Sequence, residues 1–100
     1  MTQRTVTIKN SKERFTWQQT EEQITISMPV SCVTMKNVDV LYTDFMLKVN
    51  ISSIRYVQIF DFAYEIDWAD ARNNVQLHDE SLEVLLIKAL PGLNWLGLQI

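Results

Sequence analysis

The feature that most constrains this chain is a period of two in its apolar residues. Ile24, Ile26 and Met28 alternate with Thr25 and Ser27. Successive side chains of a β-strand point to opposite faces, so this pattern is typical of a strand that buries one face. The same alternation recurs in several further segments: Val38–Tyr42, Leu47–Ile51, Phe60–Trp68 and Leu82–Leu86. We therefore predict an all-β chain with no long helix.

The apolar runs are separated by short polar segments rich in Asn, Asp and Ser. These residues form turns through local hydrogen bonds, and Asn tolerates left-handed backbone, which compensates for the scarcity of glycine. With Val6–Ile8 as a further edge strand, about seven or eight strands follow at the spacing of a sandwich. Leu82–Ile87 is apolar on both faces, which indicates a central strand or one covered by a partner. The predicted fold is a compact antiparallel β-sandwich, and the one helical alternative is a single turn within Asp67–Asn74.

Composition excludes most enzyme classes. The 100 residues include one Cys, one His and two Gly. Such a chain has no internal disulfide framework, no zinc site built from Cys and His, and no glycine-rich phosphate loop. We predict no enzyme activity, no catalytic residue, no metal and no cofactor. Three groups that might carry chemistry are interpreted as surface features: His78 in a turn, the carboxylates Asp61, Glu65 and Asp67 on a solvated strand face, and Cys32 as an inert thiol.

Charge and compartment narrow the range of partners. The formal net charge is −3, and seven acidic residues lie between Asp61 and Glu83. Phosphate backbones require clustered Lys and Arg, so we expect no nucleic-acid binding. We expect no membrane contact, because the sequence has neither a signal peptide nor an apolar run of membrane length. A single cysteine fits a reducing compartment, so the predicted localisation is cytoplasmic.

Two aromatic segments point to contact rather than chemistry. Trp17 is followed by three uncharged hydrogen-bonding residues, a combination that suits recognition on an edge or an open sheet face. Trp95 follows the Pro91-Gly92 turn and is predicted to plug one end of the sandwich. The apolar tail Leu93–Ile100 has two interpretations. It either folds back onto the domain or belongs to a chain that continues.

Several segments in order resemble the CS domain, a module shared by chaperone-associated proteins. Phe15–Thr20 and Ile24–Pro29 resemble its opening. The pattern then continues to about residue 96 through these segments: Val38-Asp39-Val40, Leu47-Lys48-Val49, Glu65-Ile66-Asp67, Leu82–Lys88 and Trp95. Trp17–Thr20 together with Leu47–Asn50 looks closest to the N-terminal CS domain of the axonemal dynein assembly factors.

The resemblance implies a sandwich related to the small heat-shock proteins, without catalytic residues, that docks onto heat-shock protein 90 type chaperones or their clients. In the closest branch, that role is the preassembly of ciliary dynein in the cytoplasm. The partner-binding positions of some relatives match Trp17, Met28 and Lys88, which would form a mixed apolar and cationic patch.

The same resemblance sets the expected domain organisation. We expect residues 1–100 to be one domain, with a core from about residue 14 to 96, in the N-terminal part of a longer protein. A monomer is favoured. The alternative is a holdase or self-assembling sandwich of the small heat-shock type, with Leu93–Ile100 as the intermolecular plug.

Overall fold

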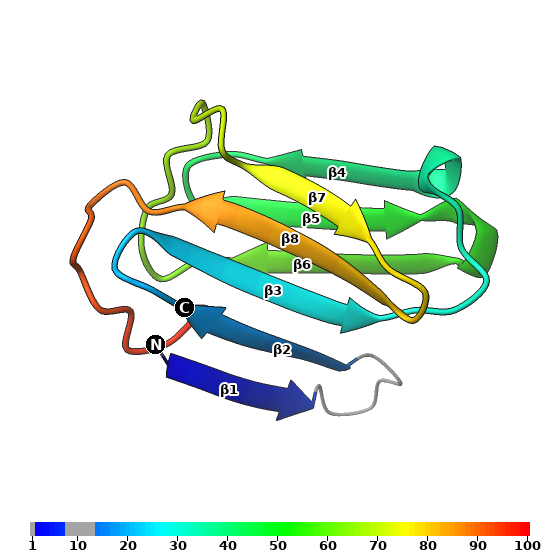
Figure 1. Ribbon diagram of the computed structural model, residues 1–100, viewed down its shortest axis with the longest axis horizontal. Helices are drawn as coiled ribbons and strands as arrows, with labels where there is room; N and C mark the ends of the chain where they lie inside the picture. The colour runs from blue at the N-terminus through cyan, green and yellow to red at the C-terminus, as the bar shows by residue number, and fades with distance from the viewer. Residues whose placement is uncertain (1, 8–13) are drawn as a thin grey trace.

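The chain forms two antiparallel sheets, as the computed structural model shows for residues 2–7 and 14–100, with side chains from residue 15 onward (Figure 1). One sheet has the strand order β1-β2-β3-β8-β7 and the other β4-β5-β6. The strands are β1 (Thr2–Thr7), β2 (Arg14–Gln19), β3 (Gln23–Pro29), β4 (Val38–Tyr42), β5 (Met46–Ile51), β6 (Tyr56–Asp61), β7 (Asn74–Leu77) and β8 (Ser81–Ile87). There are two single 3-10 turns. η1 (Met35–Asn37) precedes β4 in the connection from β3, and η2 (Ser52–Ile54) joins β5 to β6. The all-β antiparallel sandwich is therefore confirmed.

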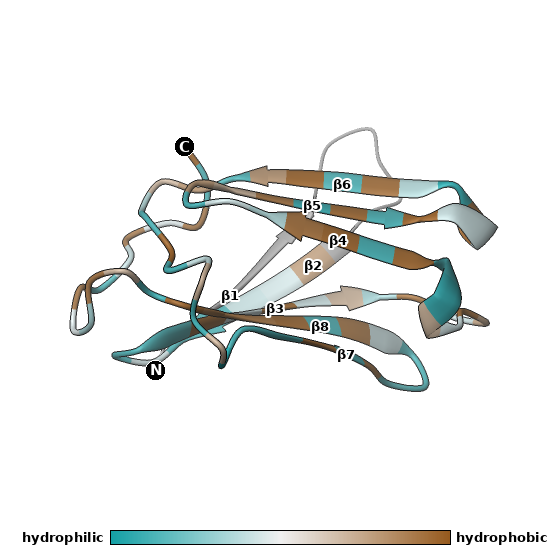
Figure 2. Ribbon diagram, turned by 90° about the horizontal axis from the view of Figure 1, so that it is seen from above, coloured by the Kyte–Doolittle hydropathy of each residue, from teal (hydrophilic) through white to brown (hydrophobic). Residues whose placement is uncertain are grey.

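The two sheets face one another and bury alternate residues of nearly every strand (Figure 2). In β3 the burial alternates along the whole strand, with Ile24, Ile26 and Met28 inside. The strand predicted to be apolar on both faces, β8, lies between β3 and β7, so it is an interior strand of its sheet. Across the described residues, the structure contains no helix long and apolar enough to cross a bilayer.

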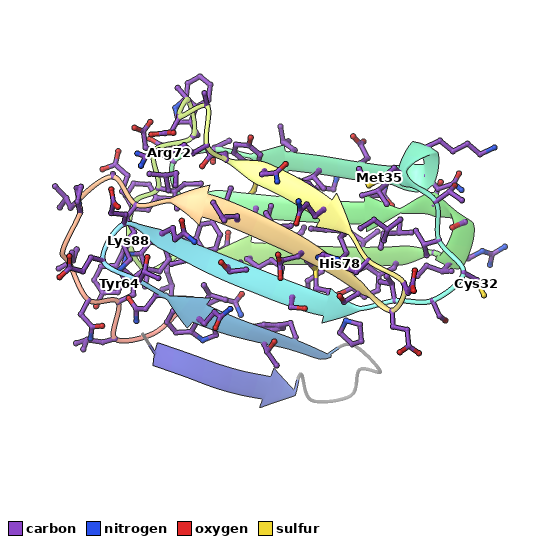
Figure 3. All side chains as sticks on the ribbon, in the orientation of Figure 1. Cys32, Met35, Tyr64, Arg72, His78 and Lys88 are labelled. Carbon is purple, nitrogen blue, oxygen red and sulfur yellow. The ribbon has the colours of Figure 1, made fainter. Side chains whose placement is uncertain are left out.

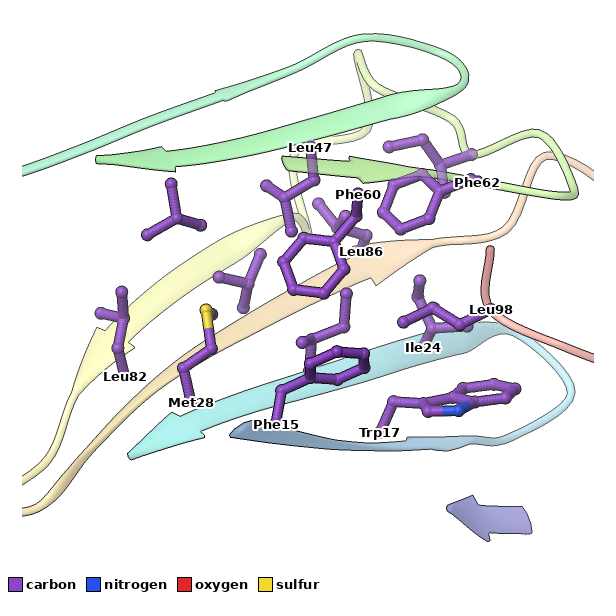
Figure 4. Close-up of a cluster of buried hydrophobic side chains, with 14 of the residues drawn as sticks. Phe15, Trp17, Ile24, Met28, Leu47, Phe60, Phe62, Leu82, Leu86 and Leu98 are labelled. Carbon is purple, nitrogen blue, oxygen red and sulfur yellow. The ribbon is translucent and has the colours of Figure 1, made fainter. Parts of the chain in front are cut away.

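Two aromatic rings connect the sheets inside the core. Phe15 of β2 and Phe60 of β6 meet edge to face, with ring centroids 4.9 Å apart and planes at 84°. Aromatic pairs favour this geometry, because the positive edge of one ring meets the negative face of the other. Leu47 and Leu86 surround the pair (Figure 4), and both are fully buried. The inter-sheet core therefore draws on both sheets across the middle of the sandwich.

The prediction of one strand over Phe60–Trp68 is wrong. β6 ends at Asp61, and the chain then crosses between the sheets. Phe62 makes an isolated bridge to Gln99, and Ile66 makes one to Lys88 at the end of the larger sheet. Alternate residues still face inward along this crossing, which preserves the period of two without a continuous strand.

The crossing ends in a polar loop rather than a helical turn. Asp67–Asn74 contains turns, and Trp68, the last residue of the alternating segment Phe60–Trp68, is 57% exposed. Asn73 fixes the loop to the sheet, since its amide donates to the Asp67 carbonyl at 2.8 Å and its oxygen accepts from the Ile87 N–H at 2.8 Å. The helical alternative is therefore also wrong.

Two details of the strand predictions have mixed outcomes. Val6 lies in the edge strand β1, as predicted, whereas Ile8 lies outside the described residues. Left-handed backbone falls on Cys32 (φ 57°) and Arg55 (φ 53°), so among the described residues asparagine does not supply it. Arg55 takes this conformation because it ends η2, where a left-handed residue closes the turn.

Phe60→Ala tests the packing of the two sheets. Removing the ring deletes the contact with Phe15 and leaves a cavity between the sheets, which we expect to lower the free energy of unfolding by about 3–5 kcal/mol. Leu41→Ala is the matched control. Its side chain is 56% exposed, so a loss below about 1 kcal/mol is expected. Urea denaturation gives both values, and equal losses for the two variants would refute this assignment of the core.

Candidate interaction site

A buried hydrogen-bond network closes one end of the sandwich. Lys88, the residue after β8, is 3% exposed. Its ammonium donates to Oε1 of Gln19 at 2.8 Å and to the carbonyl oxygen of Leu93 at 2.7 Å. The same Gln19 oxygen accepts the backbone N–H of Trp95 at 2.9 Å, and the Gln19 amide donates to the Trp95 carbonyl at 2.8 Å. The end of β2, the end of β8 and the C-terminal segment are thereby joined.

Burial also changes the proton affinity of Lys88. Desolvation lowers the pKa of its ammonium below the ordinary value of 10.5, and the negative charge of Glu21 opposes this shift only in part. The ammonium has two oxygen acceptors but no carboxylate at salt-bridge distance among the described residues. Its position is therefore held by hydrogen bonds to neutral groups.

The network seats Trp95 at the end of the core. The indole packs against Phe62 and Tyr64, with ring centroids 5.7 and 5.4 Å away, and only 2% of Trp95 is exposed. Leu98 is also buried, and the N–H of Ala63 donates to its carbonyl oxygen at 3.1 Å. The prediction that Trp95 plugs one end is confirmed. Trp95 and Leu98 of the apolar tail therefore fold back onto the domain, which is the first of the two interpretations.

The three residues expected to bind a partner do not form a surface patch. Trp17 is 2% exposed, Met28 is 0% exposed, and Lys88 is held inside the network. Figure 4 shows Trp17 and Met28 directed into the core, and Figure 3 places Lys88 at the end of the sandwich near Tyr64. The correction follows from strand parity. Trp17 and Met28 lie on the inward parity of β2 and β3, so a partner cannot touch them while the sandwich stays closed.

The exposed apolar surface lies instead on the outer face of β4, β5 and β6. Leu41 is 56% exposed, Val57 47% and Ile59 48%. Leu41 and Ile59 both pair with Lys48, on its opposite sides, and Val57 pairs with Asn50. These outward residues define the outer apolar face: Leu41, Lys48, Asn50, Val57 and Ile59. It combines aliphatic side chains with one central ammonium, and the exposed carboxylate of Asp39 lies on the same face, where Asp39 pairs with Asn50.

The outer face of the larger sheet has a different character. Its outward positions are polar and mostly uncharged: Thr16, Gln18, Gln23, Thr25, Ser27, Gln76 and Glu83. Leu85 is only partly exposed there, and Ile87 is buried. The predicted recognition segment after Trp17 therefore splits. Gln18 faces outward, whereas Gln19 faces inward and holds the network.

The groups weighed for chemistry are all exposed. His78 is exposed in the turn before β8, and its backbone N–H donates to the Ser81 carbonyl at 2.8 Å. Cys32 is exposed near the same end (Figure 3). An open depression of about 570 Å³ between the β3 end, η2 and the β7–β8 turn brings one titratable side chain, Glu80, to its wall. Within the described residues, no His, Cys, Asp and Glu side chains gather as a metal cluster.

Sequence patterns signalled part of the outer apolar face and none of the network. Leu41 lies on the otherwise polar parity of its segment, and Val57 and Ile59 lie on the parity opposite to Phe60. Apolar residues at the outward-facing positions of a strand indicate an exposed apolar face. Gln19 and Lys88 gave no such signal, because their pairing spans 69 positions of the chain.

Lys88→Met tests the burial of the ammonium through pH. Because the pKa is lowered in the folded state, the native protein releases this proton at lower pH than the unfolded chain does, so stability rises with pH as 10.5 is approached. We expect the stability of the unmutated protein relative to Lys88→Met to increase between pH 8 and 10 by at most about 1.4 kcal/mol per pH unit. Urea midpoints across this range measure the difference. A difference that stays flat or falls contradicts the assignment.

Comparison with known proteins places the fold. No family model matches the chain, and no curated protein sequence does. The nuclear movement protein from E. cuniculi GB-M1 superposes with a TM-score of 0.69 at 17% identity, over 86% of this chain and 98% of that one. The CS1 domain of USP19 gives a TM-score of 0.56 at 22% identity, over 86% of this chain and 94% of that domain. The likeness is one of fold, and this chain has the β-sandwich fold of a CS domain.

Proposed function

We propose that this chain is a non-catalytic protein-interaction domain of a chaperone-associated protein and that it docks through its outer apolar face. The observation that carries the proposal is the contrast between the two sheets. Leu41, Val57 and Ile59 are about half exposed on the smaller sheet, whereas the larger sheet presents polar groups. Exposed apolar side chains that cluster on one face are typical of a surface that binds a partner.

The partner we propose is a heat-shock protein 90 type chaperone or one of its clients. The CS-domain fold supports this assignment in general, and the resemblance of Trp17–Thr20 and Leu47–Asn50 to dynein assembly factors supports preassembly of ciliary dynein in the cytoplasm. The chemistry of the face defines the matching surface. Aliphatic contacts surround Lys48, so an apolar partner surface with one carboxylate complements it.

A second function, self-assembly or holdase activity, rests on the C-terminal segment. Leu96 is 77% exposed and Ile100 is 95% exposed, although Trp95 before them and Leu98 between them are buried. Exposed aliphatic residues beside an anchored segment suit an intermolecular contact. Sedimentation separates the two functions. The docking domain stays monomeric, whereas the self-assembling sandwich forms larger species that Leu96→Ser disperses.

Leu41→Glu tests the outer apolar face. The new carboxylate lies across from Lys48, so the fold gains a cross-strand charge pair while the face loses an apolar contact. We expect at least a tenfold weaker Kd for purified heat-shock protein 90, measured by calorimetry. Gln18→Glu is the control, since it adds the same charge to the polar outer face of β2, where its partner on β3 is Thr25, and it should change the Kd less than twofold. Equal effects of the two variants, or none from Leu41→Glu, would overturn docking through this face.

A further inference from the structure

The outer apolar face has a positive charge at its centre and apolar groups around it. Lys48 of β5 is exposed, and its cross-strand partners are Leu41 on β4 and Ile59 on β6 (Figure 2). Met46 and Asn50 are its outward neighbours along β5, and both are partly exposed. Three apolar side chains and one amide therefore surround a single ammonium. Among the described residues, no carboxylate lies within salt-bridge distance of that ammonium.

The width of this arrangement limits which partner element can cover it. Neighbouring strands lie about 4.8 Å apart, so Leu41 and Ile59, on either side of β5, are separated by about 10 Å. An extended segment is only about one strand spacing wide, so it covers one of these two side chains. An α-helix measures about 10–12 Å across with its side chains, so it contacts both. The face therefore has the width of one helix.

The neighbours of Lys48 also match the surface of a helix. A helical residue has four neighbours on its own face, three and four positions away in the sequence and about 5–6 Å distant. The four outward neighbours of Lys48 lie about 5 Å away across the strands and about 7 Å away along β5. A helix with an acidic residue and three aliphatic neighbours therefore places its carboxylate over the ammonium. Its aliphatic groups then cover Leu41, Ile59 and Met46.

Asp39 defines the fourth neighbour of the acidic residue. Its carboxylate is exposed on the same face, where Asp39 pairs with Asn50 and lies diagonally from Lys48. A basic residue four positions from the acidic one lies on the same side of the helix, so it can meet this carboxylate. The matching helix thus carries an acidic and a basic residue one turn apart within an aliphatic stripe.

We propose that the outer apolar face binds an amphipathic helix of the partner protein, with an acidic residue over Lys48 and a basic residue over Asp39. This inference rests on the proposed function and specifies the form and the charge pattern of the partner surface. The apolar contacts supply most of the affinity, and the two charges fix the orientation of the helix. A helix packed on the face of a sheet is also a common layer arrangement in proteins.

A partner helix fits this face better than a second copy of the chain. If two copies packed face to face about a twofold axis through the centre of the face, the two Lys48 side chains would lie opposite one another. Like charges opposed across an interface disfavour the complex. A carboxylate from a different protein removes this repulsion and pairs with the ammonium.

The probe is a blocked peptide of about 18 residues, long enough to form a helix, with alanine and glutamine at most positions. It carries one central glutamate, leucines four and three positions before it and three positions after it, and a lysine four positions after it. By NMR titration, we expect it to shift the amides of Leu41, Lys48 and Ile59 more than those of β2 and β3. Its helicity, measured by circular dichroism, should rise on binding.

A proline in the peptide tests the helical form. Proline two positions after the glutamate lies off the contact face and interrupts the helix, so we expect at least tenfold weaker binding. Serine at the same position is the matched control and should change the affinity less than threefold. Both peptides keep every residue that is expected to touch the protein, so the comparison isolates the conformation.

Lys48→Glu tests the charge pattern. The side chain is exposed, so the variant is expected to fold and to bind the glutamate peptide at least fivefold more weakly. A peptide with lysine in place of the central glutamate should restore the affinity to within threefold. Lys36→Glu is the matched control, because it makes the same charge change in η1 and should change the affinity less than twofold. If Lys48→Glu does not fold, the two peptides on the unmutated protein still decide, since the lysine peptide should bind at least fivefold more weakly there.

Several results would overturn the helix proposal. These are equal affinity for the proline and serine peptides, equal affinity of the unmutated protein for the glutamate and lysine peptides, amide shifts confined to the larger sheet, and a peptide-free dimer that Leu41→Glu disperses. The proposed function has a separate readout in the chaperone binding of Leu41→Glu. Chaperone binding that depends on Leu41, without peptide binding, refutes the helix and keeps the docking face. Selective peptide binding without chaperone binding keeps the helix and refutes the chaperone as partner.

Discussion

The ammonium of Lys88 is held between the side-chain oxygen of Gln19 and the carbonyl of Leu93, and the closed end of this sandwich depends on that contact. Burying a charge is unfavourable unless hydrogen bonds replace its water. Removing one partner leaves the other unsatisfied, at a cost of about 1–3 kcal/mol. The same Gln19 also fixes the backbone of Trp95 on both sides, so the network converts an irregular segment into part of the core.

The unequal sheets give the C-terminal segment its importance. Five strands face three, and the crossing from Asp61 to Ile66 joins the smaller sheet to the end of the larger one. Trp95 and Leu98 fill the open end, and the last residues reach the edge of β6. Exposed apolar side chains remain on the outer face of the smaller sheet.

Side-chain periodicity predicted the class of the fold and most of the core, because parity alone decides which residues of a strand face inward. It failed along the crossing, where the strand does not continue: Phe62 bridges to Gln99 and Ile66 bridges to Lys88 at the end of the larger sheet. It also failed where a polar residue lies inside. Lys88 and Gln19 satisfy one another across 69 positions, and no local pattern encodes that pairing. Trp17 and Met28, which the resemblance implied as partner-binding residues, lie inside the closed sandwich, because a resemblance transfers positions without their burial. Their role in partner binding stays a prediction.

The most direct test of this account is hydrogen exchange at the backbone amide of Trp95. That amide lies outside any strand, and its acceptor is the buried oxygen of Gln19. If the network anchors the segment, the Trp95 amide exchanges only by global unfolding, with protection equal to that of the slowest amides of β3 and β8. Exchange as fast as that of the exposed Leu96 amide would show that the segment opens by itself, and the account of the closed end would be wrong.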